Sequence, residues 1–496
     1  MTDLFNPDSE SRTPSCKSST RGHLARVALI AGGAIALATA CSSAEPPVVA
    51  TEREPVALVS ASSASMPGAK ATPTAASART RLGELIENGP RSGIAGEPLN
   101  VELLRRFYAR HGYAPVWTTR KDQADSLMKA VLRAGDHGLA PDLFHADLLQ
   151  SPAALPPLER ELMLSNAFLS YADALARGVM PIERRRDDEV LTPAPIDIAA
   201  VLDVAIDSSE PAAVIERLAP KTPTYRLLRE ALQNSRGSVP GGGPGKAAAT
   251  THLREIKVNL ERERWLPRRL PADRVWVNVA DERVVMYRDD RPVFSSRVIV
   301  GQDDRHNQSP EFQASIDRIM FNPPWNIPPD IAASEILPLA NRDPNYLAKH
   351  NMVILPDGIV QQKAGATSGL GFLLFEMQNR FDVYLHDTPS KNLFLRDNRR
   401  ISHGCIRVED PRKLAALLMQ QPIKEIDQSI ATGDTTRSDL PRSVPVFVVY
   451  ETAFADADGK LQFRPDVYQR DAEIWRYLDP KGRAMAEREE SDQGGR

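Results

Sequence analysis

The chain has 496 residues, of which 42% are hydrophobic, and its 62 Lys and Arg nearly balance its 65 Asp and Glu, giving a formal charge of −3. A chain of this length can bury two hydrophobic cores. The balanced charge gives no basis for a nucleic-acid partner, and no phosphate-binding glycine loop is present to hold a nucleotide. We therefore expect two ordinary globular domains, no nucleic acid and no cofactor.

The N-terminus predicts an export signal over residues 1–40. Arg21 and Arg26 lead into the apolar segment 27–40, which is shorter than the roughly twenty residues that span a bilayer. Ala38 and Ala40 satisfy the small-residue rule for cleavage, and Cys41 follows directly, as in a bacterial lipoprotein but with Ala where Leu is usual. We expect a periplasmic protein anchored to the outer or inner membrane through a lipidated Cys41; ordinary cleavage and a soluble periplasmic protein stay open.

Residues 41–80, rich in Ala, Ser, Pro and Thr, are predicted to be a disordered tether. Residues 81–234 are predicted to form a helical domain, because apolar residues recur there at helical spacing. Four large side chains follow this spacing at i, i+4, i+7 and i+11: Leu164, Phe168, Tyr171 and Leu175. Residues 101–110 and 225–232 behave likewise. This half contains no constellation of catalytic residues.

Glycine, proline and alanine dominate residues 235–251, SRGSVPGGGPGKAAATT, which are predicted to be a linker. The pattern then becomes alternating and β-branched, so residues 252–480 are predicted to be a mainly β domain with a helix at 411–419. The expected strands are 274–280, 283–288, 293–300, 312–320, 382–386 and 444–450. We predict an α+β protein.

Proline and glycine recur through residues 322–380, which we predict to be an excursion that caps a site. Residues 481–496 are expected to be a disordered tail.

Cysteine usage indicates one reactive thiol. Cys16 lies in the predicted signal and Cys41 at its cleavage point, which leaves Cys405 as the lone thiol of the mature chain. In an oxidising compartment, an unpaired cysteine flanked by His403 and Gly404 in ISHGCIRVED is typical of a reactive group and not of a disulfide. A free thiol has a pKa of about 8.5, so we expect a base or a positive charge beside it.

Two histidines, His403 and His386, are candidates for that base. His403 lies two residues before Cys405. His386 ends the predicted strand DVYLH, nineteen residues before Cys405, and shares a strand face with Tyr384. The turn-rich connection is long enough to return SHGC to the end of this strand. Gly404 lets the surrounding amides turn inward as an oxyanion hole for acyl transfer.

The segments YLHDTPS and SHGCIRVE resemble the signature of the L,D-transpeptidases with a YkuD-type catalytic domain. Further segments, VNLERERWLP, FNPPWNIPP with EILP, and DADGKLQFRPDVY, resemble the large periplasmic branch of that family, which carries a helical scaffold. Members of this branch usually insert a peptidoglycan-binding module before the ERERWLP segment. Here that place holds only the predicted linker.

The resemblance implies a role for each matching residue. Cys405 would be the nucleophile and His386 the general base, with the backbone carbonyl of Asp387 orienting the imidazole. His403 and Gly404 would shape the loop and its oxyanion hole. The residues implied in substrate binding are Ser402, Tyr384, Arg407 and Trp325, the last of these in the capping segment.

The implied reaction belongs to cell-wall biogenesis. The cysteine would form an acyl-enzyme with a peptidoglycan tetrapeptide stem, release the terminal D-alanine and pass the acyl group to a neighbouring stem, giving a 3-3 link between two diaminopimelates. Water, a lipoprotein lysine or a free D-amino acid are alternative acceptors, so L,D-carboxypeptidase, attachment and exchange activities stay open. The resemblance also implies acylation by carbapenems.

Three other classes compete with this interpretation. A zinc site needs three or four ligands, and the chain after Cys41 supplies no cysteine other than Cys405 and no HExxH pattern, so we expect no metal. A papain-like cysteine hydrolase places its histidine after the cysteine, whereas His403 is the last histidine of this chain. A wall-binding protein that has lost its activity would not be expected to keep the whole motif.

Overall fold

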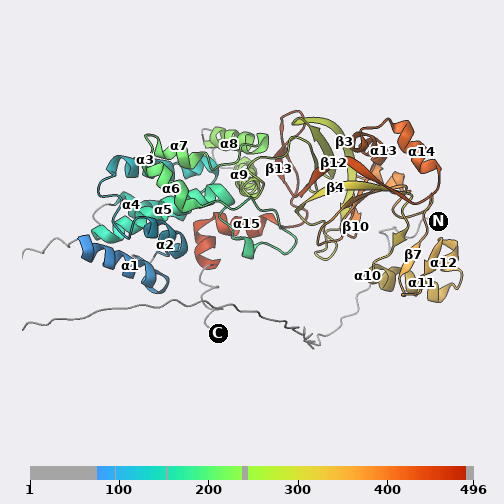
Figure 1. Cartoon of the computed structure of the whole chain (residues 1–496), viewed down its shortest axis with the longest axis horizontal. Helices are drawn as coiled ribbons and strands as arrows, with labels where there is room; N and C mark the ends of the chain where they lie inside the picture. Colours follow the sequence, from blue (N-terminus) through green and yellow to red (C-terminus); the bar gives the residue numbers. More distant parts are fainter. Residues whose placement is uncertain (1–74, 95–96, 152–154, 237–243, 487–496) are drawn as a thin grey trace, which may run out of the picture. The chain divides into compact units, whose positions relative to one another are not determined.

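The computed structural model describes residues 75–94, 97–151, 155–236 and 244–486 (Figure 1). The predicted signal, Cys41 and most of the predicted tether lie outside these residues. Within the described ranges, no helix is both long and apolar enough to cross a bilayer.

The first half of the described chain is helical, as predicted. Its α-helices are α1 (Ala75–Ser92), α2 (Val101–Arg110), α3 (Lys121–Leu132), α4 (Ala146–Gln150), α5 (Pro157–Arg177), α6 (Ile198–Ile206), α7 (Pro211–Glu216), α8 (Pro223–Arg236) and α9 (Pro244–Glu263). Short 3-10 turns separate some of them: η1 (Ala134–His137), η2 (Pro141–Phe144) and η4 (Ile182–Arg184). The four side chains at predicted helical spacing are all buried along α5, which confirms that pattern.

Three predicted boundaries are wrong. Helix α1 begins at Ala75, inside the predicted tether. Helix α9 begins at Pro244, inside the predicted linker, because proline is tolerated in a first helical turn and the Lys-Ala-Ala-Ala that follows has high helix propensity. Residues 480–486 are helical, although a disordered tail was expected from 481.

The second half is built on one sheet. Its strands are β1 (Arg274–Asn278), β2 (Arg283–Arg288), β3 (Arg291–Gly301), β4 (Phe312–Phe321), β8 (Leu373–Met377), β9 (Leu385–His386), β10 (Arg400–Ser402), β11 (Ile406–Val408) and β12 (Thr436–Val449). They lie in the order β10-β3-β11-β9-β8-β4-β12-β1-β2. Because β3 also pairs with β2, the sheet closes on itself as a barrel with β10 attached at one side.

Alternation along the strands fills the barrel with apolar side chains. Val275 and Val277 of β1 are fully buried in a core that also takes Leu414 from helix α13 (Pro411–Met419) and Ile426 from helix α14 (Ile423–Ala431). Helix α13 has the predicted bounds, with Pro411 in its first turn. Two further strands, β13 (Ala453–Ala455) and β14 (Leu461–Phe463), form a hairpin, and α15 (Asp471–Leu478) follows.

The capping excursion has its own small fold. Strands β5 (Trp325–Asn326), β7 (Val360–Gln362) and β6 (Met352–Ile354) pair in that order as a separate sheet. The helical elements α10 (Pro329–Ile331), η5 (Ala332–Ile336), α11 (Leu337–Arg342) and α12 (Tyr346–Lys349) lie between β5 and β6 in the chain, and Figure 1 shows α10, α11, α12 and β7 as one group. The excursion ends before β8, a barrel strand, and not at the predicted residue 380.

The predicted boundary at residue 252 is not a break in packing. Ile256 and Leu260 of α9 are buried in the core of the helical domain, together with Phe447 of β12 and Ile474 of α15. The core of the helical domain therefore extends onto β12 and α15 of the second half, while the barrel interior forms a separate core.

Candidate active site

Strand pairing brings the two ends of the predicted motif together. Strands β9 and β11 are parallel neighbours, with His386 opposite Arg407 and Leu385 opposite Ile406. The Ile406 amide also donates to the Tyr384 carbonyl over 2.9 Å. Because Cys405 directly precedes β11, these contacts hold its backbone beside the start of β9.

The imidazole of His386 is buried and fixed in one tautomer. Its Nδ1 lies 2.6 Å from the backbone carbonyl oxygen of Asp387, the partner that the family resemblance implied. A carbonyl oxygen only accepts, so Nδ1 carries the proton and Nε2 of the neutral ring keeps its lone pair. This arrangement leaves Nε2 as a proton acceptor.

Asp387 is itself held on both sides. Its Oδ2 accepts from the Phe372 amide over 2.9 Å, and its Oδ1 lies 2.7 Å from Nζ of Lys391. Gly371, with φ +61°, lies so close that an added Cβ would be 2.5 Å from Oδ2 of Asp387. These contacts fix the peptide whose carbonyl orients His386.

Burial favours the neutral forms of His386 and Cys405. Burial, and to a smaller extent the positive charge of Arg407, together lower the pKa of His386 to about 3, against the opposing hydrogen bond to Asp387. Burial also raises the pKa of the Cys405 thiol, although a hydrogen bond from the Tyr384 backbone and the charge of Arg407 oppose this. The resting thiol is therefore protonated, and a neutral imidazole and the cation of Arg407 belong to the same site.

The positive charge of Arg407 acts on both His386 and Cys405 and lowers the pKa of each. Burial lowers its pKa to about 10, which leaves the guanidinium charged at neutral pH. A fixed positive charge here favours the thiolate that forms when the proton leaves Cys405. Cys405 is the free thiol of the described chain; its residue is partly exposed, and its Sγ donates to the Asp382 carbonyl over 3.9 Å.

The loop between β10 and β11 is braced from within. Oγ of Ser402 donates to the Cys405 carbonyl over 2.6 Å and accepts from the Gly404 amide over 3.2 Å. Gly404 has φ +107°, which favours glycine. Because its amide is directed at Ser402, Gly404 supplies loop geometry and not an oxyanion-hole donor, a correction to the expectation that its amide turns inward. Ser402 acts within the loop.

The capping segment reaches this loop directly. Nε2 of His403 lies 2.8 Å from Oε1 of Glu335, in η5 of the capping segment. This element is a π-helix, a distortion frequent at functional sites. The His403 side chain therefore interacts with the capping segment.

Tyr384 and Trp325, the other two residues implied in substrate binding, have fewer described contacts with the cysteine loop. Tyr384 is partly exposed, and burial together with the charges of Asp382 and Cys405 raises the pKa of its hydroxyl. Trp325 pairs with Gln362 in the capping sheet and packs on Gly369, and no contact described for it reaches Cys405.

Three contributors were not identified from the sequence. They are the Asp382 carbonyl, Glu335 and Ser309, whose Oγ donates to the Gly404 carbonyl over 2.7 Å. Glu335 could have been identified from the sequence, because it lies in the EILP segment that carries the family resemblance. A backbone carbonyl such as that of Asp382 cannot be identified in this way, because every residue has one. Within the described ranges, no group of three or more His, Cys, Asp or Glu side chains could hold a metal ion.

Two protein-family models match this chain. Residues 102–232 match the Scaffold domain and residues 272–443 match the L,D-transpeptidase catalytic domain of the YkuD family. A Haemophilus influenzae protein named "Putative L,D-transpeptidase" is 28% identical over 402 residues, covering 75% of this chain and 78% of its own length.

One solved structure, the carbamoyl enzyme of Ldtfm with avibactam, matches at 12% identity and a TM-score of 0.19, over 36% of this chain and 49% of its own. The Scaffold and catalytic matches, and the cysteine–histidine site that lies in the second of them, place this chain among the L,D-transpeptidases with a YkuD catalytic domain and an N-terminal scaffold domain.

Proposed function

We propose that the chain forms 3-3 cross-links between peptidoglycan stems through an acyl-enzyme on Cys405. The observation that carries the proposal is the register between β9 and β11, which sets the cysteine loop beside a neutral His386 whose Nε2 is free to accept a proton. A buried neutral imidazole beside a protonated thiol is suited to general-base activation of the nucleophile.

The steps follow from these groups. Nε2 of His386 takes the proton from Sγ as the sulfur attacks the donor peptide carbonyl. The Cys405 amide stabilises the oxyanion, and His386 then returns the proton to the departing D-alanine. A side-chain amine of a second stem, deprotonated by the same imidazole, attacks the thioester and releases Cys405.

The acceptor decides between the proposal and its alternatives. Water in place of the second stem gives an L,D-carboxypeptidase, and a lipoprotein lysine or a free D-amino acid gives an attachment or exchange activity. A simple cysteine hydrolase would likewise shorten the stem without joining two. We infer that the contact between Glu335 and His403 holds the capping segment over the cysteine loop and limits the access of water to the thioester, which favours transfer over hydrolysis.

The test is mass spectrometry of the purified enzyme and its products. We expect carbapenem treatment to leave an adduct on Cys405, and a disaccharide-tetrapeptide substrate to yield a dimer that has lost one D-alanine. The Cys405→Ala variant should give neither while it remains folded. Tripeptide product alone supports the carboxypeptidase, and turnover by Cys405→Ala would refute the proposal.

We further propose that the enzyme works in the periplasm as a lipoprotein anchored through Cys41. The support is the signal-like N-terminal sequence, since Cys41 lies outside the described residues.

A further inference from the structure

Ser309 is a buried residue outside the catalytic motif that contacts the loop carrying Cys405. It lies between β3 and β4 and is fully buried. Its Oγ donates to the Gly404 carbonyl over 2.7 Å and accepts from the Gly301 amide over 3.0 Å. An added Cβ at Gly301 would lie 2.6 Å from the Ser309 nitrogen, so the backbone here admits Ser309 only because residue 301 is glycine.

This contact constrains an atom of the proposed reaction. The Gly404 carbonyl and the Cys405 amide belong to one planar peptide unit, so fixing the direction of the C=O also fixes the direction of the N–H. The Cys405 amide is a candidate oxyanion-hole donor, whereas the Gly404 amide is directed at Ser402. Ser309 thereby sets where the Cys405 amide points.

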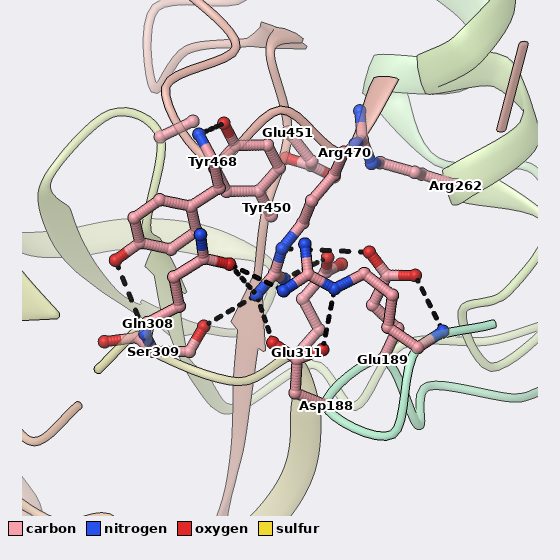
Figure 2. A network of polar contacts seen from close by, with 12 residues as sticks. Asp188, Glu189, Arg262, Gln308, Ser309, Glu311, Tyr450, Glu451, Tyr468 and Arg470 are labelled. Atoms are coloured by element: carbon pink, nitrogen blue, oxygen red, sulfur yellow. Dashed lines mark hydrogen bonds and ion pairs between the residues drawn. The ribbon is translucent and has the colours of Figure 1, made fainter. Parts of the chain in front are cut away.

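Ser309 is held in turn by a buried arginine (Figure 2). Nη2 of Arg470 donates to the Ser309 carbonyl over 3.3 Å and to Oδ2 of Asp188 over 2.6 Å, while Nη1 donates to Oε1 of Glu311 over 2.7 Å. The Arg470 side chain is fully buried, so these ion pairs are shielded from water and from salt. The hydroxyl of Tyr468 accepts from the Ser309 amide over 3.4 Å.

Asp188 belongs to the helical half of the chain, in the segment between η4 and α6. Its carbonyl accepts from the Glu311 amide over 2.7 Å, and the Val190 amide donates to the Glu311 carbonyl over 3.0 Å. Nη2 of Arg186 also donates to Oε1 of Gln308 over 2.9 Å. Residues on both sides of Ser309 are therefore fastened to residues 186–190.

We propose that Ser309 is a positioning residue for the Cys405 amide, and that Asp188 of the helical domain, through Arg470, holds Ser309 in place. The inference rests on the proposed acyl-enzyme at Cys405. In this proposal the helical domain contributes to the reaction, because Asp188 and Arg470 hold Ser309, and Ser309 holds the peptide between Gly404 and Cys405.

Two reactions at the same sulfur separate positioning from general damage. Carbapenem acylation passes through an oxyanion, whereas alkylation by iodoacetamide displaces iodide from a saturated carbon and forms none. We expect Ser309→Ala to slow acylation by about tenfold or more, because a misdirected donor loses part of the hundredfold or larger effect of an oxyanion-hole group, while alkylation changes by less than about twofold. Ser309→Thr keeps the hydroxyl and should restore acylation.

Asp188→Asn tests the contribution of the helical domain. It should slow acylation in the same direction, and the double variant with Ser309→Ala should be no slower than Ser309→Ala alone, because both act through one contact. The matched control is Ser165→Ala, a buried serine in α5 that bonds Tyr108 and Trp117; it should lower Tm and leave acylation unchanged.

Equal acylation rates for Ser309→Ala and the parent enzyme would overturn the proposal, as would acylation and alkylation that fall together. If the effects of Ser309→Ala and Asp188→Asn multiply, the link to the helical domain is wrong. If Ser309→Ala does not fold, the ratio of the two rates in Asp188→Asn decides. If the parent enzyme is never acylated at Cys405, the proposed function is wrong, and this result is distinct from a failure of the Ser309 proposal.

Discussion

Glu335 of the capping segment and His403 of the cysteine loop lie in direct contact, with 2.8 Å between Oε1 and Nε2. The two residues are far apart in the chain, and their contact joins the excursion to the SHGC motif. Because His403 lies two residues before Cys405, this contact holds the capping segment against the loop that carries the proposed nucleophile.

We expect Glu335→Gln to lower kcat/KM about two- to fivefold, mainly through KM, because a partly exposed polar pair contributes at most about 1 kcal/mol. Steady-state kinetics measure this. Asp330→Asn is the control, because its contact with His306 spans 3.8 Å and both side chains are well exposed. The covering role fails if the two variants behave alike.

His386→Ala should reduce turnover on the order of a thousandfold, because base and nucleophile act as a unit. His403→Ala should cost less, since this ring contacts Glu335 and does not take the proton. In the parent enzyme, iodoacetamide alkylation should keep rising with pH up to about pH 9, because burial raises the pKa of Cys405 above the usual value of about 8.5. A plateau near pH 6 would instead indicate a standing thiolate and contradict the neutral pair.

The buried imidazole should also make folding sensitive to acid. The pKa of His386 is lowered from 6.5 to about 3, so between these values the unfolded chain binds a proton that the folded chain does not. The folded state should lose up to about 1.4 kcal/mol for each pH unit from this group as pH falls through that window. Urea unfolding between pH 4.5 and 7 measures the slope, which should be shallower in His386→Gln; equal slopes would contradict the buried neutral ring.

Gly371→Ala should impair both folding and activity. The new Cβ would lie 2.5 Å from Asp387, whose carbonyl orients His386, and φ is +61°. We expect a loss on the order of 2 kcal/mol in the free energy of unfolding and a fall in kcat. Gly459→Ala is the matched control, because it shares a positive φ of +75° with nothing within 4 Å. If its kcat falls as far, the clash with Asp387 is not the cause.

Cys41→Ala should abolish incorporation of labelled fatty acid and release the protein from the membrane fraction, if the lipoprotein proposal holds. Mass analysis of the mature N-terminus provides the second measurement. An unmodified N-terminus after Ala40, with unchanged fractionation, would favour ordinary cleavage.

Short-range sequence patterns were enough to predict the class of fold and to suggest the family and its candidate site. Local patterns predicted α5, α13 and the first four barrel strands, because helix and strand periodicities are properties of short segments. The motif made Cys405 and His386 the candidate nucleophile and base for the same reason, because its residues lie in short segments. The start of helix α9 was not predicted, because glycine and proline occur both in linkers and in first helical turns. The local sequence alone does not distinguish the two.

The arrangement of the site could not be predicted without the folded structure. The register of β9 against β11, the direction of the Gly404 peptide and the contacts of Ser309, Glu335 and Asp188 depend on residues far apart in the chain. Burial, which keeps both His386 and Cys405 neutral, likewise exists only once the barrel and loops have closed around them. Such contacts and their dielectric surroundings leave no periodic signal in the sequence.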